Sequence, residues 1–139
     1  MTNTGMAGAY MRQAERALEE AKRHLAAEGW GLAVRRAQEA LELGLKSLLR
    51  YAGVETPKWH DVGGILLKHR DRFPPQYAKR MEDFARWSAE LRSKREPALY
   101  GDESRGVGSD ELFSMSEAEE AVRWAGEVFS SVREILKRK

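Results

Sequence analysis

Residues 32 to 52 carry apolar side chains at helical spacing over a wide arc. These apolar positions are Ala33, Ala37, Ala40, Leu41, Gly44, Leu45, Leu48, Leu49 and Ala52. Because small and large residues share this arc, a helix built from them can be buried against more than one neighbour. The segment predicts a central helix of an all-helical protein, and Gly53 predicts where that helix ends.

Helical spacing also governs most of the remaining chain, and no segment has the alternating pattern of a half-buried strand. We predict further helices over residues 6–27, 61–69, about 75–96 and from 116 to the end of the chain. Asp61 is a suitable N-cap for the short helix, and Ser116 with Glu119 has the spacing of a capping box for the last one. The predicted fold is all-α: an antiparallel up-and-down bundle of four long helices and one short helix.

The length of the chain, residues 1–139, is typical of a single domain. Residues 1–5 predict a flexible tail. Residues 97–114, which are rich in Gly and Ser, predict an irregular loop that is the most mobile internal segment. The wide apolar arc over residues 32–52, with Trp87 beside the inner stripe of the 75–96 helix, predicts a homodimer.

Charge and cysteine content exclude several classes of site. The chain has 24 Lys and Arg against 22 Asp and Glu, so anion binding must depend on local clusters rather than on a polycationic surface. There is no Cys, which excludes disulfides, Cys-based zinc sites and thiol catalysis. The three His are not at metal-ligand spacing, and we therefore expect no metal and no cofactor.

The sequence also suggests where the protein works. It has no signal peptide and no apolar run near eighteen residues, so we expect a cytoplasmic protein without a membrane partner. Abundant charge, the lack of Cys and the preference for Arg over Lys point to a thermophilic source.

Residues 92 to 102 place a guanidinium, a phenol and a carboxylate close together at a predicted helix end. One face of that helix carries, at steps of four, three and four, Phe84, Ser88, Leu91 and Arg95. The spacing predicts that Arg95 lies on the buried face, in the last turn before Pro97 ends the helix. Asp102 is the nearest candidate carboxylate for Arg95 in the sequence.

Three hypotheses fit this cluster. In the first, Arg95 pairs with Asp102 or with a carbonyl at the helix end and has only a structural role. In the second, the guanidinium of Arg95 binds phosphate and Tyr100 stacks on a base or donates a hydrogen bond, with Arg92 and Lys94 widening the anion site. In the third, Arg95 and Tyr100 are the catalytic residues of a ribonuclease.

Three stretches of the chain, in this order and spacing, resemble the HEPN (higher eukaryotes and prokaryotes nucleotide-binding) domain family. Residues 36–49 (RAQEALELGLKSLL) are similar to its second helix. Residues 59–66 (WHDVGGIL) resemble its short His-led segment, and residues 95–102 (REPALYGD) resemble its Arg-led motif. The resemblance covers nearly the whole chain. It implies a helical bundle that commonly forms a homodimer, with two Arg-led motifs facing one cleft.

Many members of that family are metal-independent ribonucleases in which an Arg is followed, after four to six residues, by a His. Here four residues follow Arg95 and the next is Tyr100, a residue type that does not ordinarily titrate near neutral pH. The resemblance therefore implies a nucleotide- or RNA-binding homodimer that works with a small nucleotidyltransferase as a toxin–antitoxin-like pair. The candidate binding residues are Arg92, Lys94, Arg95, Tyr100, Asp102 and His60.

Two alternatives remain open from the sequence. One is a metal-independent ribonuclease that uses Arg95 and Tyr100. The other is a non-catalytic dimeric scaffold, in which protein carboxylates fully neutralise Arg95.

Overall fold

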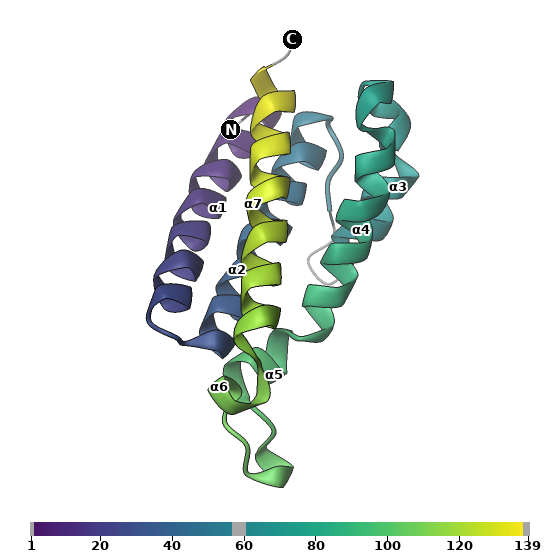
Figure 1. Cartoon of the computed structure of the whole chain (residues 1–139). Helices are drawn as coiled ribbons and strands as arrows, with labels where there is room; N and C mark the ends of the chain where they lie inside the picture. The colour runs from purple at the N-terminus through teal and green to yellow at the C-terminus, as the bar shows by residue number, and fades with distance from the viewer. Residues whose placement is uncertain (1, 57–60, 138–139) are drawn as a thin grey trace.

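The structure is a computed structural model that describes residues 2–56 and 61–137, and every long element within those ranges is a helix (Figure 1). The long helices are α1 (Asn3–Ala26), α2 (Trp30–Tyr51), α4 (Ala78–Ser93) and α7 (Met115–Lys137). The short helices are α3 (Val62–Lys68), α5 (Arg95–Tyr100) and α6 (Ser109–Leu112). Single 3₁₀ turns span Arg70–Arg72, Pro75–Tyr77 and Glu103–Arg105. The predicted all-α fold is confirmed, with two short helices more than expected.

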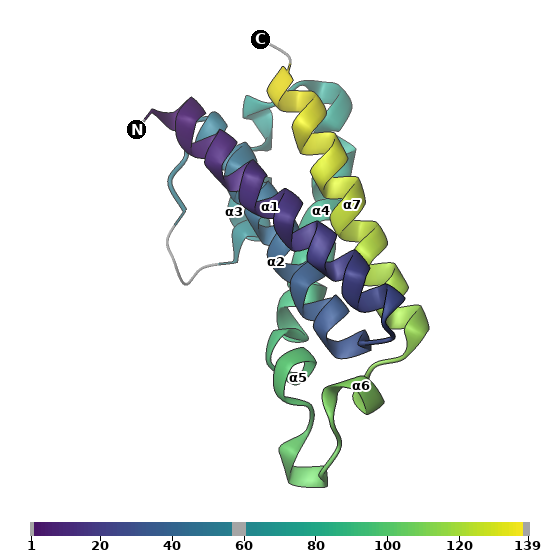
Figure 2. The ribbon, with the colours of Figure 1, turned by 90° about the vertical axis from the view of Figure 1, so that its left-hand side faces the viewer.

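The four long helices alternate in direction along the bundle, as Figures 1 and 2 show together. Helix α2 is the central one: it packs chiefly against α1 and α7 and also contacts α3, α4, α5 and α6. Its leucines Leu41, Leu45, Leu48 and Leu49 are almost fully buried. The wide apolar arc of residues 32–52 is therefore covered by several helices of the same chain.

Helix α1 begins earlier than predicted, because Thr2 caps it. The Thr2 side chain accepts a hydrogen bond from the Gly5 amide at 3.0 Å, which satisfies one of the free amides of the first turn. Part of the segment predicted as a flexible tail is consequently helical. After a turn in which Glu28 has a φ of 62°, α2 returns antiparallel to α1.

Helix α3 begins as predicted, with the Asp61 carboxylate accepting from the Gly63 amide at 3.0 Å. It then lies very close to α4. A Cβ placed on Gly63 would be 2.9 Å from both the Cα and the carbonyl oxygen of Ala85, whereas a Cβ on Gly64 would meet no described atom within 4 Å. The absence of a side chain at Gly63 is what allows the two helices to approach.

Gly63→Ala is expected to lower the free energy of unfolding by about 1–3 kcal/mol, since the backbone of α4 must shift to admit the methyl group. Gly64→Ala is the matched control and should be neutral or stabilising by up to about 1 kcal/mol, because alanine favours the helix and the position is open. Urea unfolding of both variants measures the difference. Equal stabilities would contradict the close packing of α3 on α4.

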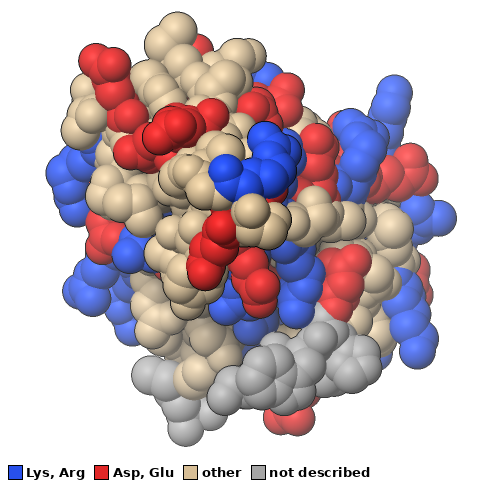
Figure 3. Space-filling model, turned by 90° about the horizontal axis from the view of Figure 1, so that it is seen from below, with Lys and Arg blue, Asp and Glu red and all other residues tan. Residues whose placement is uncertain are grey.

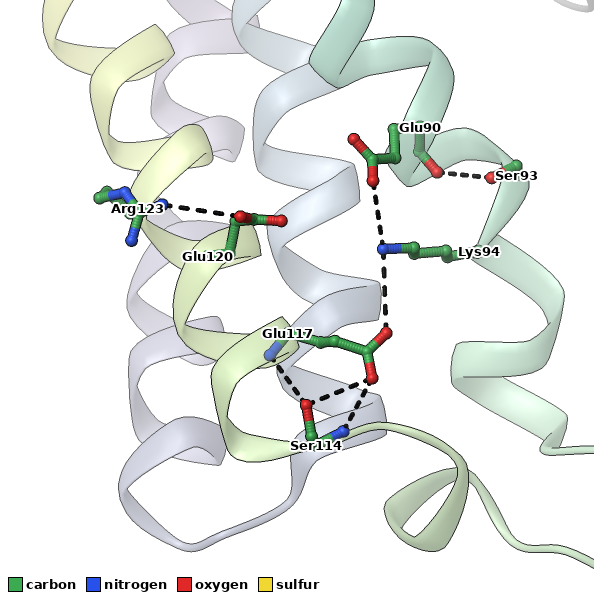
Figure 4. A network of polar contacts seen from close by, with 7 residues as sticks. All are labelled: Glu90, Ser93, Lys94, Ser114, Glu117, Glu120 and Arg123. Atoms are coloured by element: carbon green, nitrogen blue, oxygen red, sulfur yellow. Dashed lines mark hydrogen bonds and ion pairs between the residues drawn. The ribbon is translucent and has the colours of Figure 1, made fainter.

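The capping box of α7 is Ser114 with Glu117, and the predicted pair Ser116 with Glu119 is wrong. The Ser114 hydroxyl accepts from the Glu117 amide at 3.1 Å, and the Glu117 carboxylate accepts from the Ser114 amide at 3.2 Å (Figure 4). Both pairs have the same spacing. Phe113 is buried and has extended backbone, so the chain turns into α7 directly after it. This position selects Ser114 as the N-cap of the helix.

The predicted irregular loop over residues 97–114 is mostly regular structure. It contains most of α5, a 3₁₀ turn, a backbone pairing of Asp102 with Val107, and α6. Helix α6 is docked on α2: the Asp110 carboxylate accepts from the Gly31 amide at 3.2 Å. Gly29, the N-cap of α2, offers no side chain of its own, so Asp110 supplies a capping group from far along the sequence.

Candidate functional site

The site lies where α4 ends and α5 begins. Helix α4 stops at Ser93, and α5 starts at Arg95 with its own first hydrogen bond, from the Ala98 amide to the Lys94 carbonyl at 2.9 Å. Pro97 sits in the first turn of α5, where an amide would have no helical partner. It therefore starts a new helix instead of ending the old one. The break changes the helical phase, and Arg95 is exposed; the prediction that it lies on the buried face is wrong.

The Arg95 side chain forms no hydrogen bond or ion pair with any residue in the described part of the chain. Its neighbour in space is Arg35 on α2, whose side chain is only 14% exposed. The pKa of Arg35 lies below its usual value, chiefly because Arg35 is buried and secondly because the positive charge of Arg95 is close to it. Arg35 donates to Gln38 at 3.4 Å and lies 3.5 Å from Glu39.

The two guanidinium groups line one hollow of about 300 Å³. Its other lining residues are Glu96, Leu99 and Tyr100. We call it the arginine hollow. Two cations that share a small space repel each other, and a bound anion would relieve that repulsion.

The other predicted cations of this segment are already paired. Arg92 forms an ion pair of 2.8 Å with Glu42. Lys94 lies between Glu90 at 3.6 Å and Glu117 at 3.9 Å, and so connects the end of α4 to the start of α7 (Figure 4). Both therefore stabilise helix packing, and neither lines the arginine hollow.

Asp102, the nearest candidate carboxylate in the sequence, is not the partner of Arg95, so the ion pair offered by the first hypothesis does not form. Its carboxylate accepts from the Ser104 hydroxyl at 2.7 Å and from the Arg105 amide at 3.3 Å, which forms the turn that follows α5. The Ser104 hydrogen bond is the main reason that the pKa of Asp102 lies below its usual value. The Asp102 carboxylate therefore has its hydrogen-bond partners in residues that follow it directly in the sequence, and not in Arg95.

Tyr100 is 62% exposed and borders two hollows. The second hollow, of about 510 Å³, is lined by Glu96, Pro97, Tyr100, Gly101, Asp102, Glu103 and Leu112. We call it the acidic hollow, because its charged lining residues are carboxylates. The predicted site residue His60 lies outside the described residues.

Arg35 is a functional candidate that the structure adds to those predicted from the sequence. Its spacing from Gln38 and Glu42, three and then four residues, puts it on the same polar stripe of an otherwise apolar helix. That stripe was a usable signal. Arg35 itself stands just before the stretch that resembles the family's second helix.

The surrounding surface does not form a broad basic field. Figure 3 views this end of the molecule, and Lys or Arg alternates there with Asp or Glu. Among the described residues there is no group of three His, Asp or Glu that could hold a metal ion. No helix in residues 2–56 and 61–137 is long and apolar enough to cross a membrane.

Comparison with known proteins gives a consistent result. A family model described as the HEPN domain matches residues 7–135. A crystal structure of ST0689, an archaeal HEPN homologue, is similar with a TM-score of 0.71 and 24% identity, covering 94% of this chain and 97% of that one. The crystal structure of TT1696 from Thermus thermophilus has a TM-score of 0.69 and 22% identity, covering 92% and 96%. The sequence has no significant match among curated proteins.

Proposed function

The chain belongs to the HEPN family, and on that premise we propose that it binds a nucleotide or RNA, with a phosphate of the ligand held between Arg35 and Arg95. The observation that carries this proposal is that two arginines, Arg35 and Arg95, line the same hollow. The side chain of Arg95 has no protein partner among the described residues. A guanidinium offers a planar fork of donors that matches phosphate oxygens. Tyr100, exposed at the rim, offers a face on which a base can stack.

The proposal includes a homodimer and a small nucleotidyltransferase partner in a toxin–antitoxin-like pair. The family resemblance supports both. The apolar arc of α2 no longer supports the dimer, because helices of the same chain cover it, and Trp87 stacks on Trp124 of α7 with ring centroids 5.4 Å apart. Light scattering at micromolar concentration should give the mass of two chains of 15.8 kDa each. A monomer mass would remove the dimer from the proposal and leave the arginine hollow intact.

Arg95→Ala is expected to weaken nucleotide or RNA binding by about 1.5–3 kcal/mol, which is the contribution typical of a charged hydrogen bond. Arg95→Lys should recover little, since an ammonium lacks the planar fork. The melting temperature should not change, because Arg95 is exposed and forms no ion pair with a described residue. Isothermal titration and thermal melting on the same protein samples measure both quantities.

Arg86→Ala is the matched control, because Arg86 is an exposed arginine on α4 that forms a local ion pair with Asp83 at 3.0 Å. It should leave binding unchanged. The scaffold alternative predicts the opposite pattern, with lower stability in Arg95→Ala and no ligand for any variant. RNA incubated with the wild-type protein and a chelator tests the ribonuclease alternative: cleavage that is lost in Arg95→Ala and in Tyr100→Phe would support it.

A further inference from the structure

The two hollows on either side of Tyr100 differ in charge. The arginine hollow contains both guanidinium groups, whereas the acidic hollow is lined by three carboxylates, those of Glu96, Asp102 and Glu103. Tyr100 and Glu96 line both. Tyr100 therefore borders two hollows, one that contains both arginines and one whose charged lining residues are all acidic.

The carboxylates of the acidic hollow are not equally available. Asp102 is held by Ser104 and Arg105. The side chains of Glu96 and Glu103 form no hydrogen bond or ion pair with any residue in the two described ranges. Side chains without a protein partner in the described ranges thus surround Tyr100 with both signs of charge: Arg95 lines the arginine hollow, Glu103 lines the acidic hollow, and Glu96 borders both. A ligand that complements this arrangement needs an anionic end, a flat ring and a hydrogen-bond donor edge.

We propose that the site selects a guanosine phosphate unit. This inference rests on the proposed function and adds the identity of the base. The phosphate occupies the arginine hollow, the base lies against Tyr100, and the base edge donates to Glu103 or Glu96 in the acidic hollow. Volumes of about 300 and 510 Å³ are in the range of small-molecule sites.

The donor pattern of the bases decides the choice. Guanine presents two adjacent donors, N1–H and the 2-amino group, which match the two oxygens of one carboxylate. Adenine and cytosine place a ring-nitrogen acceptor beside their amino group, and that acceptor faces a carboxylate unfavourably. Uracil has a single N–H between two carbonyls. Carboxylates on the acidic side of Tyr100 therefore favour guanine over the other three bases.

The test compares GMP, IMP and AMP by isothermal titration on the full-length protein. IMP keeps N1–H but lacks the 2-amino group. We expect GMP to bind about 10- to 100-fold more tightly than AMP, with IMP between them, because hydrogen bonds to a charged group are lost stepwise. A pentamer of uridines with one central guanosine, against the same pentamer with inosine, repeats the comparison in RNA. The GMP and pentamer measurements together identify a free nucleotide or an RNA segment as the source of the unit.

The double variant Glu96→Gln/Glu103→Gln should bind GMP and AMP equally. A glutamine amide has a single acceptor oxygen, so it cannot accept hydrogen bonds from both donors of guanine as a carboxylate does. Glu119→Gln/Glu127→Gln changes the net charge by the same amount at two exposed positions of α7 and should keep the preference for GMP.

Binding without preference for guanine in the wild-type protein, or a preference that survives in Glu96→Gln/Glu103→Gln, would overturn the inference and leave the proposed function standing. Absence of any nucleotide or RNA binding, or binding that Arg95→Ala does not weaken, would overturn both.

Discussion

Gly31→Ala should lower the free energy of unfolding by about 3 kcal/mol, at the upper end of what an added methyl group costs in a packed interior. Gly31 lies in the first turn of α2, directly against the 95–112 segment. A Cβ there would overlap the Ser109 side chain and would lie 2.8 Å from the carbonyl oxygen of Ala98. Ser109 can rotate away, but the Ala98 carbonyl is part of the backbone of α5 and moves only with that helix.

The same substitution should weaken ligand binding, because α5 carries Arg95 and Tyr100. Urea unfolding and isothermal titration measure the two effects. Gly126→Ala is the matched control: it also adds a methyl group to a glycine within a long helix, but its Cβ would meet no atom of the described residues within 4 Å. That variant should be neutral or more stable by up to about 1 kcal/mol. If Gly31→Ala behaves like Gly126→Ala, then α5 and α6 are not docked on α2 as described.

Gly101→Ala should cost about 2–4 kcal/mol of local stability, since backbone strain and a steric clash act together. Gly101 ends α5 with φ 70° and ψ −154°, a conformation that side chains rarely adopt. Its Cβ would also fall on the Val107 carbonyl oxygen and lie 2.9 Å from the Ser109 nitrogen. The expected result is loss of the Asp102–Val107 backbone pairing, seen as faster hydrogen exchange of both amides.

Gly106→Ala separates the two contributions. Gly106 also has a positive φ, of 68°, but a Cβ there would come within 4 Å of no atom in residues 2–56 and 61–137. It should therefore show only the conformational cost, about 1 kcal/mol. Equal protection of the Asp102 and Val107 amides in the two variants would mean that the Val107 carbonyl does not confine Gly101.

The sequence predicts the long helices well because their apolar periods are long and unbroken. Leu41, Leu45, Leu48 and Leu49 occupy the core as their spacing indicates. The break at Lys94 could not be predicted in this way, because the helical spacing of Phe84, Ser88 and Leu91 continues without interruption to Arg95. Pro97 is compatible with either a helix end or a helix start, and only packing against α2 selects the second.

The candidate site was predicted in part. Arg95 and Tyr100 do line one hollow. Asp102 is the nearest candidate carboxylate for Arg95 in the sequence, yet Ser104 and Arg105 are nearer still to Asp102 and form a turn around it. The nearness of Arg35 to Arg95 depends on how α5 packs on α2, a contact between segments sixty residues apart in the numbering that no local pattern encodes.

The cap that Asp110 places on α2 has a consequence for how the chain acquires its structure. The hydrogen bond from Gly31 to Asp110 spans 79 residues, whereas the contacts between α1 and α2 are local. During synthesis the α1–α2 hairpin leaves the ribosome long before residue 110 does. The amides in the first turn of α2 therefore stay exposed to water until Asp110 is available. Closure of that end, and with it the placing of α5 beside Arg35, belongs to a late step of folding.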